Sequence, residues 1–269
     1  MTLADDPGFA LLRERLAGHP LPPLDMYKDK CLRRRLAVRM RACGVKTLAE
    51  YAALLDRKPD EVSRLLATLT INVTQFFRNP EAWERLAEEL EVLAEGGISA
   101  WCAGCASGEE PYTLAMLLAD QRERSGTSRP ARGARIDATD VDEKCLQAAK
   151  DAVYSLSSFT EAPPAMVRRW TIENGTERRI HETVRGLVRV QRHDLGRDPP
   201  PAPPYDLVIC RNVVIYFERD AQERLFSLFA DALRPGGLLF LGKVEMLYGP
   251  ARARFVNVDG RERIYRRAA

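Results

Sequence analysis

Residues 101–113, WCAGCASGEEPYT, combine an apolar run, a turn of small residues and two carboxylates. The turn holds Gly104 and Gly108, and the small side chains between them let a cofactor approach the backbone closely. Pro111 suits the first turn of a following helix. The segment therefore predicts a strand, a cofactor-binding turn and a helix, as in a Rossmann-like sheet.

The carboxylates Glu109 and Glu110 stand where a phosphate-binding loop would avoid negative charge. A positively charged cofactor fits them better, and S-adenosylmethionine carries both an ammonium and a sulfonium group. Cys102 and Cys105 form a C-x-x-C pair without a second pair or a histidine cluster. We therefore expect them to line the turn rather than to bind zinc or perform redox chemistry, and we expect no metal site.

A second pair of carboxylates, Asp140 and Asp142, follows the apolar run at residues 134–139. An acid at the end of this strand can accept hydrogen bonds from both ribose hydroxyls of a nucleoside. It can equally act as the N-cap of the next helix. We assign Asp140 to the ribose and Asp142 to the cap.

Two further strands end in polar residues. Asp194 and Leu195 follow the run at 187–192, where an adenine contact or ordinary turn chemistry would explain the acid. Arg211 and Asn212 follow the run at 206–210, and such side chains directly after a buried strand indicate function more than packing.

The elements that must position these residues are short apolar runs alternating with helical segments, at residues 98–103, 134–139, 187–192, 206–210 and 238–242. This alternation predicts a parallel sheet with crossover helices. The final runs, 254–258 and 261–265, flank Asp259-Gly260, a hairpin signal. The fold class is thus α/β, a Rossmann-like seven-stranded sheet with an antiparallel terminal hairpin, as in class I S-adenosylmethionine-dependent methyltransferases.

The chain divides into two predicted domains. Residues 1–78 show apolar positions at helical spacing and predict a small all-α domain, and residues 79–269 contain the sheet. Within the second domain, residues 163–190 interrupt the alternation and predict either a hairpin leading into a core strand or a small inserted β subdomain.

Composition is that of an ordinary globular protein, with 269 residues, 45% hydrophobic and 29% charged. No apolar run is long enough to span a membrane, and the acidic start lacks the pattern of a signal peptide. We therefore expect a cytoplasmic monomer without membrane insertion.

Positive charge gathers in residues 28–46, which hold eight basic residues against one acid, Asp29. A charge run is usually a solvated helix face. It could also bind an acidic protein helix or track the phosphates of a nucleic acid.

Five motifs together make the sequence resemble the CheR family of chemotaxis receptor methyltransferases: INVTQFFR (71–78), the segment at 100–120, ATDVDEKCL (138–146), YDLVICRNVVIYF (205–217) and RPGGLLFLG (234–242). They cover nearly the whole chain in the right order. The resemblance implies methyl transfer from S-adenosylmethionine to glutamate side chains of chemoreceptors, which yields glutamyl methyl esters and S-adenosylhomocysteine.

Position by position, the resemblance implies cofactor contacts from Asn72, Thr74, Arg78, Glu109, Asp140, Asp194, Leu195, Arg211 and Asn212. Arg78 suits the cofactor carboxylate and Glu109 its ammonium. The resemblance also implies that the basic segment binds the receptor's cytoplasmic helical domain. The candidate residues are Lys28, Arg34, Arg35, Arg39 and Arg41.

Tyr216 and Arg211 are the candidate catalytic residues, and Tyr216 is the polar group best placed to orient a substrate carboxylate. One rival function is that of a nucleic-acid methyltransferase, but the Asp-Pro-Pro at 198–200 precedes its strand and cannot face the cofactor. We therefore expect no nucleic-acid partner. Another rival is a non-catalytic regulator that responds to S-adenosylmethionine.

Overall fold

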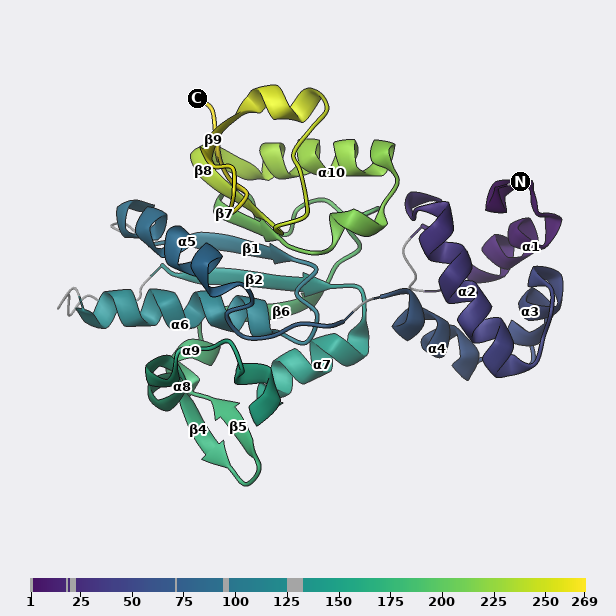
Figure 1. Ribbon diagram of the computed structural model, residues 1–269, viewed down its shortest axis with the longest axis horizontal. Coiled ribbons are helices and arrows are strands. Elements are labelled where there is room, and N and C mark those ends of the chain that lie inside the picture. The colour runs from purple at the N-terminus through teal and green to yellow at the C-terminus, as the bar shows by residue number, and fades with distance from the viewer. Residues whose placement is uncertain (1, 18, 20–22, 71, 94–96, 125–132) are drawn as a thin grey trace. The chain divides into compact units, whose positions relative to one another are not determined.

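The computed structural model describes residues 2–17, 19, 23–70, 72–93, 97–124 and 133–269 (Figure 1). They form two compact units, one of Met1–Asn72 with Tyr216–Gln222, the other of Val73–Ile215 with Glu223–Ala269. The division falls at Asn72 rather than at residue 78, because Phe76 and Phe77 belong to the hydrophobic core of the second unit. Ile71, the first residue of the INVTQFFR motif, lies outside the described residues.

The first unit is helical, as the sequence predicts. Its helices are α1 (Pro7–Leu16), α2 (Asp29–Cys43), α3 (Leu48–Leu55) and α4 (Asp60–Leu69). Helix α2 buries Leu32 and Leu36, and Gly44 after its last residue is a left-handed C-cap with φ 71°. Helix α3 begins with a capping box between Thr47 and Glu50.

The segment Tyr216–Gln222 packs within this helical unit although it follows the sheet in sequence. An antiparallel bridge joins Tyr27 and Phe217, and their rings meet edge to face with centroids 5.2 Å apart. The Lys28 amide donates to the Tyr216 carbonyl oxygen at 2.8 Å. The start of α2 is therefore fixed to the chain that leaves the sheet.

The second unit contains a sheet of seven strands in the order β6-β2-β1-β7-β8-β10-β9. The strands are β1 (Ser99–Ala103), β2 (Arg135–Asp140), β6 (Val188–Arg192), β7 (Tyr205–Cys210), β8 (Leu233–Leu241), β9 (Phe255–Asp259) and β10 (Ile264–Arg267). The first five pair in parallel, and β10 pairs antiparallel with both β8 and β9. The predicted fold class is confirmed.

Helices cover both faces of this sheet. The helices beside the sheet include α5 (Pro80–Leu93), α6 (Glu109–Arg124), α7 (Glu143–Asp151) and α10 (Arg219–Ala232), whose first four residues belong to the helical unit. Cys102 of β1 shares a core with Trp83 of α5 and Leu117 of α6. Its neighbour Trp101 points the other way, with its ring 5.7 Å from that of Phe229 in α10. Figure 1 accordingly shows α6 and α10 on opposite sides of the sheet.

The terminal hairpin differs from the prediction in its turn. Strand β9 continues to Asp259 and β10 begins at Ile264, so four residues connect them instead of the Asp259-Gly260 pair. The reason is that one Asp259 carboxylate oxygen accepts the amides of Arg261 and Glu262, both at 2.9 Å. This Asx turn opens a longer loop than the two-residue signal implied.

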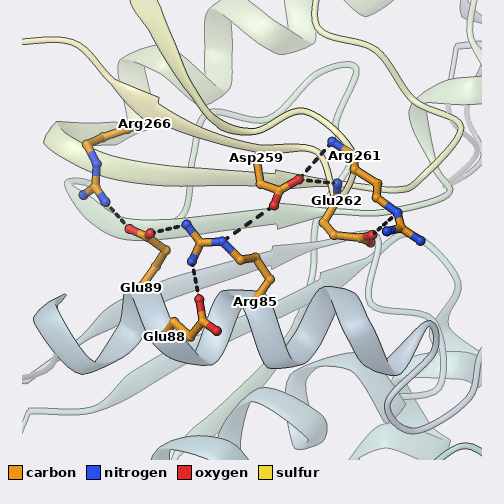
Figure 2. A network of polar contacts seen from close by, with 7 residues as sticks. All are labelled: Arg85, Glu88, Glu89, Asp259, Arg261, Glu262 and Arg266. Atoms are coloured by element: carbon orange, nitrogen blue, oxygen red, sulfur yellow. Dashed lines mark hydrogen bonds and ion pairs between the residues drawn. The ribbon is translucent and has the colours of Figure 1, made fainter.

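Charged side chains tie α5 to this hairpin (Figure 2). Arg85 contacts Glu89 at 2.6 Å within α5 and reaches Asp259 of the hairpin at 3.6 Å. Glu89 in turn pairs with Arg266 of β10. The network bridges elements distant in sequence, but each partly exposed pair contributes little on its own.

A second, three-stranded antiparallel sheet has the order β3-β5-β4, with two strands inside the predicted insertion at 163–190 and one, β3, before it. Its strands are β3 (Val153–Ser155), β4 (Thr171–Asn174) and β5 (Glu177–Ile180), accompanied by α8 (Pro164–Trp170) and α9 (Glu182–Arg185). Gly175 turns the β4–β5 hairpin at φ 63°. The chain then returns to the main sheet as β6. In the described part of the chain, no helix is long and apolar enough to cross a membrane.

Candidate functional site

The turn after β1 has no room for larger residues at its two glycines. Gly104 and Gly108 adopt φ 84° and 100°. A Cβ on Gly104 would lie 2.5 Å from Val213 Cγ2, and one on Gly108 would lie 2.8 Å from Tyr154 Oη. Both the backbone conformation and the neighbouring atoms therefore require glycine.

Asp140 ties this turn to the end of β2. Its Oδ2 accepts the Ala106 amide at 2.9 Å, and its Oδ1 accepts the Val141 and Asp142 amides at 2.7 and 3.0 Å. Burial raises the pKa of Asp140, while these amide bonds oppose the rise. Asp142 accepts the Lys144 amide at 2.9 Å, and its predicted role as the N-cap of α7 is confirmed.

Glu109 is a buried carboxylate beside the turn, with 4% of its surface exposed. It accepts the Ser107 hydroxyl at 2.7 Å, and we find no ion pair for it among the described residues. Burial raises its pKa, because a carboxylate without a cation is poorly stabilised away from water. Glu110 next to it has its pKa raised to about 7, mainly by burial and against the opposing charge of Arg211.

The segment that enters the second unit packs beside the turn. Phe76 stacks on Phe159 with centroids 4.3 Å apart, and the Phe77 amide donates to Thr113 Oγ1 of α6 at 3.0 Å. Arg78 remains half-exposed and donates to the Val73 carbonyl oxygen at 3.0 Å. Thr74, also half-exposed, lies between these anchors.

Asp194 lies in the turn after β6 with 3% of its surface exposed. Its Oδ1 accepts the Gly196 amide at 2.9 Å. This hydrogen bond is the turn-stabilising role that the sequence analysis gave as the alternative to an adenine contact. Its Oδ2 is buried and has no hydrogen bond, with Arg197 Nε 3.7 Å away. An unsatisfied acceptor of this kind suits an amino-group donor. Leu195 beside it is half-exposed.

Arg211 is 6% exposed and connects the end of β7 to the segment before α5. It donates to the Arg78 carbonyl oxygen at 3.0 Å and to Asn79 Oδ1 at 3.1 Å. Its guanidinium also lies 4.7 Å from the centroid of Phe240 and 5.4 Å from that of Trp83. The structure thus gives Arg211 the packing role that the sequence interpretation disfavoured, and a direct cofactor or catalytic contact stays a prediction.

Glu245 is a residue of this site that the sequence analysis missed. It is 2% exposed, and its carboxylate accepts the amides of Asn212 and Val213, each at 2.9 Å. Asn212 itself adopts φ 60°, a left-handed conformation that asparagine tolerates better than most residues. A carboxylate shortly after the apolar run at 238–242 was the available signal.

Eight of the predicted site residues lie in the second unit: Thr74, Arg78, Glu109, Asp140, Asp194, Leu195, Arg211 and Asn212. The last six follow or end β1, β2, β6 and β7, which are adjacent in the sheet order. Because parallel strands end at a common edge, these residues share its carboxyl side. Asn72, Tyr216 and the basic residues belong to the helical unit.

Those edge residues fit S-adenosylmethionine. Glu109 is a buried anion for which the described residues supply no cation, and Asp194 Oδ2 is a buried acceptor without a donor. A ligand with a cationic amino-acid end and an amino-bearing ring would satisfy both groups. At the two glycines themselves the turn backbone lies in close contact with Val213 and Tyr154, with no room for a side chain.

Within the helical unit, the predicted substrate-binding residues fall into two groups. Arg34 and Arg41 of α2 are exposed. Arg39 instead forms a bidentate ion pair with Glu61 of α4, in which its Nε and Nη2 lie 2.8 and 2.7 Å from the two carboxylate oxygens. Its side chain therefore joins α2 to α4. Arg35 donates to the Thr68 carbonyl oxygen.

Tyr216 lies against the basic helix. The guanidinium of Arg35 stands over its ring, 5.7 Å from the centroid. Lys28, at the start of α2, donates its amide to the Tyr216 carbonyl as described above. Tyr216 therefore packs, within the helical unit, beside the helix that carries the positive charge.

The cysteines of the turn are free thiols, and Cys102 and Cys105 are buried. Burial raises the pKa of both well above the ordinary value, so that each remains protonated and unreactive. Among the residues that the structure describes, no cluster of histidine, cysteine and carboxylate side chains is arranged to hold a metal ion.

Comparisons with known proteins agree with this architecture. Residues 72–264 match the SAM-binding domain of CheR methyltransferases, and residues 10–70 match the all-alpha domain of the same family. A chemotaxis protein methyltransferase of Listeria innocua is 34% identical over 233 residues, which cover 85% of this chain and 86% of that protein. Chemotaxis protein methyltransferase 2 of Pseudomonas aeruginosa is 32% identical over 244 residues, with 88% and 85% covered.

A larger relative, an uncharacterized 104.1 kDa protein of Rhodobacter capsulatus, is 36% identical over 227 residues. The match covers 82% of this chain but only 23% of that protein. Two family domains in the right order, spanning both structural units, decide the assignment. The chain belongs to the CheR methyltransferase family and is a methyltransferase that uses S-adenosylmethionine.

Proposed function

We propose that this enzyme methylates glutamate side chains in the cytoplasmic helical domain of chemoreceptors, giving glutamyl methyl esters for sensory adaptation in chemotaxis. Relatives named chemotaxis protein methyltransferases support the biological setting. In this proposal the enzyme acts in the cytoplasm as a monomer. S-adenosylmethionine, when bound, supplies an electrophilic methyl group on a sulfonium.

The carboxyl edge of the sheet would hold the cofactor. Glu109 would pair with the ammonium and Arg78 with the carboxylate of its amino-acid end. Asp140 would accept the ribose hydroxyls, and Asp194 with Leu195 would contact the adenine. Asn72, Thr74, Arg211 and Asn212 complete the proposed set.

The observation that carries the proposal is the path of the chain after β7. Asn212 stands at the sheet edge, and four residues later Tyr216 packs under Arg35 of the basic helix. Tyr216 comes four positions after Asn212, so the chain passes directly from the cofactor edge into the unit that carries the basic helix. Chemoreceptor methylation helices are rich in acidic and amide side chains, which such a basic helix would attract.

A carboxylate substrate would need no general base. A glutamate is already deprotonated at neutral pH and needs positioning more than activation. Of the histidines, His193 shares a hydrogen bond with the Pro199 carbonyl, and His181 caps α9. Tyr216 and the neighbouring cations would orient the incoming carboxylate.

A transfer assay tests the proposal. Methyl-labelled S-adenosylmethionine is incubated with the enzyme and either a receptor cytoplasmic fragment or a nucleic acid. We expect alkali-labile label in the receptor fragment only. Label in the nucleic acid would support the rival methyltransferase function, and cofactor binding without transfer would support a regulator; either result would overturn the proposal.

Charge reversal separates the basic helix from general electrostatics. Arg34→Glu with Arg41→Glu should raise the KM for the receptor fragment at least about tenfold, because two exposed cations become anions facing an acidic helix. Arg57→Glu, an exposed arginine of the same unit outside α2, is the matched control. Equal KM values for the double variant and wild type would contradict the assigned surface.

A further inference from the structure

Glu245 connects two loops at the carboxyl edge of the sheet. It lies in the loop that follows β8, and its Oε2 accepts the Gly242 amide of that loop at 2.6 Å. The same oxygen accepts the Asn212 amide at 2.9 Å, and Oε1 accepts the Val213 amide at 2.9 Å. The Ile215 amide also contributes a hydrogen bond. One side chain thus gathers the donors of both loops.

The loop after β7 depends on this carboxylate for its conformation. Asn212 is left-handed, and the successive amides of Asn212 and Val213 both point at Glu245. Such paired amides form a concave anion-binding nest. Without an acceptor they would be donors left unsatisfied in a buried place, which costs more than the loss of an ordinary hydrogen bond.

The carboxylate packs closely against Gly242. A Cβ on Gly242 would lie 2.7 Å from Glu245 Oε2 and 2.8 Å from the Asn212 nitrogen. On its other side the loop packs against the cofactor turn, because Val213 Cγ2 occupies the space that a Gly104 side chain would need. A shift of Glu245 would therefore move the loop relative to the turn.

The charge of Glu245 is stabilised by backbone dipoles. Burial raises the pKa of Glu245, and the amides of Asn212, Gly242, Val213 and Ile215 oppose that rise. Among the described residues no ion pair is formed by its carboxylate. A glutamine at this position would present an amino group to an amide donor on at least one side.

We propose that Glu245 is a positioning residue for methyl transfer, because it fixes the loop at 212–215 between the cofactor turn and the segment that continues to Tyr216. This inference rests on the proposed function for its activity readout. The residue acts through the loop backbone and makes no contact with the reacting atoms. Its effect should therefore appear in turnover more than in cofactor affinity.

Glu245→Gln is the first test. We expect kcat with the receptor fragment to fall at least about tenfold, equivalent to about 1.4 kcal/mol in the barrier, while the dissociation constant for S-adenosylhomocysteine changes less than about threefold. Hydrogen exchange at the Asn212 and Val213 amides should quicken at least about tenfold. Asp137→Asn is the matched control, since Asp137 is a buried carboxylate that accepts the Tyr205 hydroxyl and pairs with Arg135 away from this loop.

Gly242→Ala provides a second variant if Glu245→Gln does not fold, because it keeps the carboxylate and displaces it. Unchanged kcat and unchanged amide exchange in a folded variant would overturn the inference, as would an equal fall in kcat for Asp137→Asn. If the wild type transfers no methyl to the receptor, the proposed function fails. The amide exchange then still decides whether Glu245 holds the loop.

Discussion

Arg39→Met should destabilise the helical unit rather than weaken substrate binding alone. The Arg39 and Glu61 side chains are 16% and 4% exposed, and the buried Tyr51 hydroxyl donates to Glu61 at 2.7 Å. Removing one partner of a buried ion pair lowers the free energy of unfolding by about 3–5 kcal/mol. Because Arg39 is partly exposed, we expect a loss near the lower end, about 3 kcal/mol. The remaining Glu61 carboxylate would be buried without its cation.

The assay exploits the positions of the tryptophans. Trp83, Trp101 and Trp170 all lie in the second unit, so their fluorescence reports on that unit, whereas far-ultraviolet circular dichroism detects the helices of both. In urea, the variant should lose helical signal at lower concentration than wild type, while the fluorescence transition stays in place.

A double variant tests the cause. Glu61→Gln added to Arg39→Met removes the stranded charge but keeps an acceptor for Tyr51, and it should recover part of the lost stability. Burial raises the pKa of Glu61, but its hydrogen bonds to Arg39 and Tyr51 outweigh this and lower the pKa overall. The pair's contribution is therefore present above the ordinary carboxyl range and lost as pH falls through the lowered pKa. An unfolding free energy for Arg39→Met within about 0.5 kcal/mol of wild type would refute the reasoning.

Two further predictions concern the cofactor edge. Gly104→Ala places a Cβ 2.5 Å from Val213 Cγ2 at φ 84°, and should cost about 2–4 kcal/mol in thermal unfolding and weaken binding of S-adenosylhomocysteine in calorimetry. Wild-type affinity in this variant would contradict the packing described. Glu110 has its pKa raised to about 7, chiefly by burial, so its ionisation destabilises the fold as pH rises from about 4.5 toward 7. Glu110→Gln should flatten the dependence of the melting temperature on pH in that window, and an unaltered slope would count against the buried carboxylate.

Much of the fold could be predicted from sequence because its signals are local. Apolar runs with small-residue turns located the strands of the parallel sheet, and Asp142 followed from ordinary capping chemistry. The predicted terminal turn was too short. The Asp259 side chain accepts two amides of the loop, and the Asp-Gly dipeptide signal does not take this side-chain hydrogen bonding into account.

The site residues depended on contacts that sequence spacing does not encode. Arg39 was assigned to substrate binding from the basic run and the family resemblance, and its ion pair with Glu61, 22 residues away, could not be read from the sequence. Arg211 was assigned a functional role because it follows a strand, and the contacts of its guanidinium with the Trp83 and Phe240 rings could not be predicted from that position. Glu245 was not predicted because its carboxylate accepts backbone amides from a loop that is distant in sequence.

The most direct test of the account is to locate the transferred methyl group. A receptor cytoplasmic fragment is treated with enzyme and S-adenosylmethionine, digested and sequenced by mass spectrometry, with Tyr216→Phe and Glu245→Gln enzymes in parallel. The account predicts a methyl ester on glutamate side chains that alkali removes, formed more slowly by both variants. Methylation confined to other residue types, or none by the wild type with the cofactor bound, would contradict it.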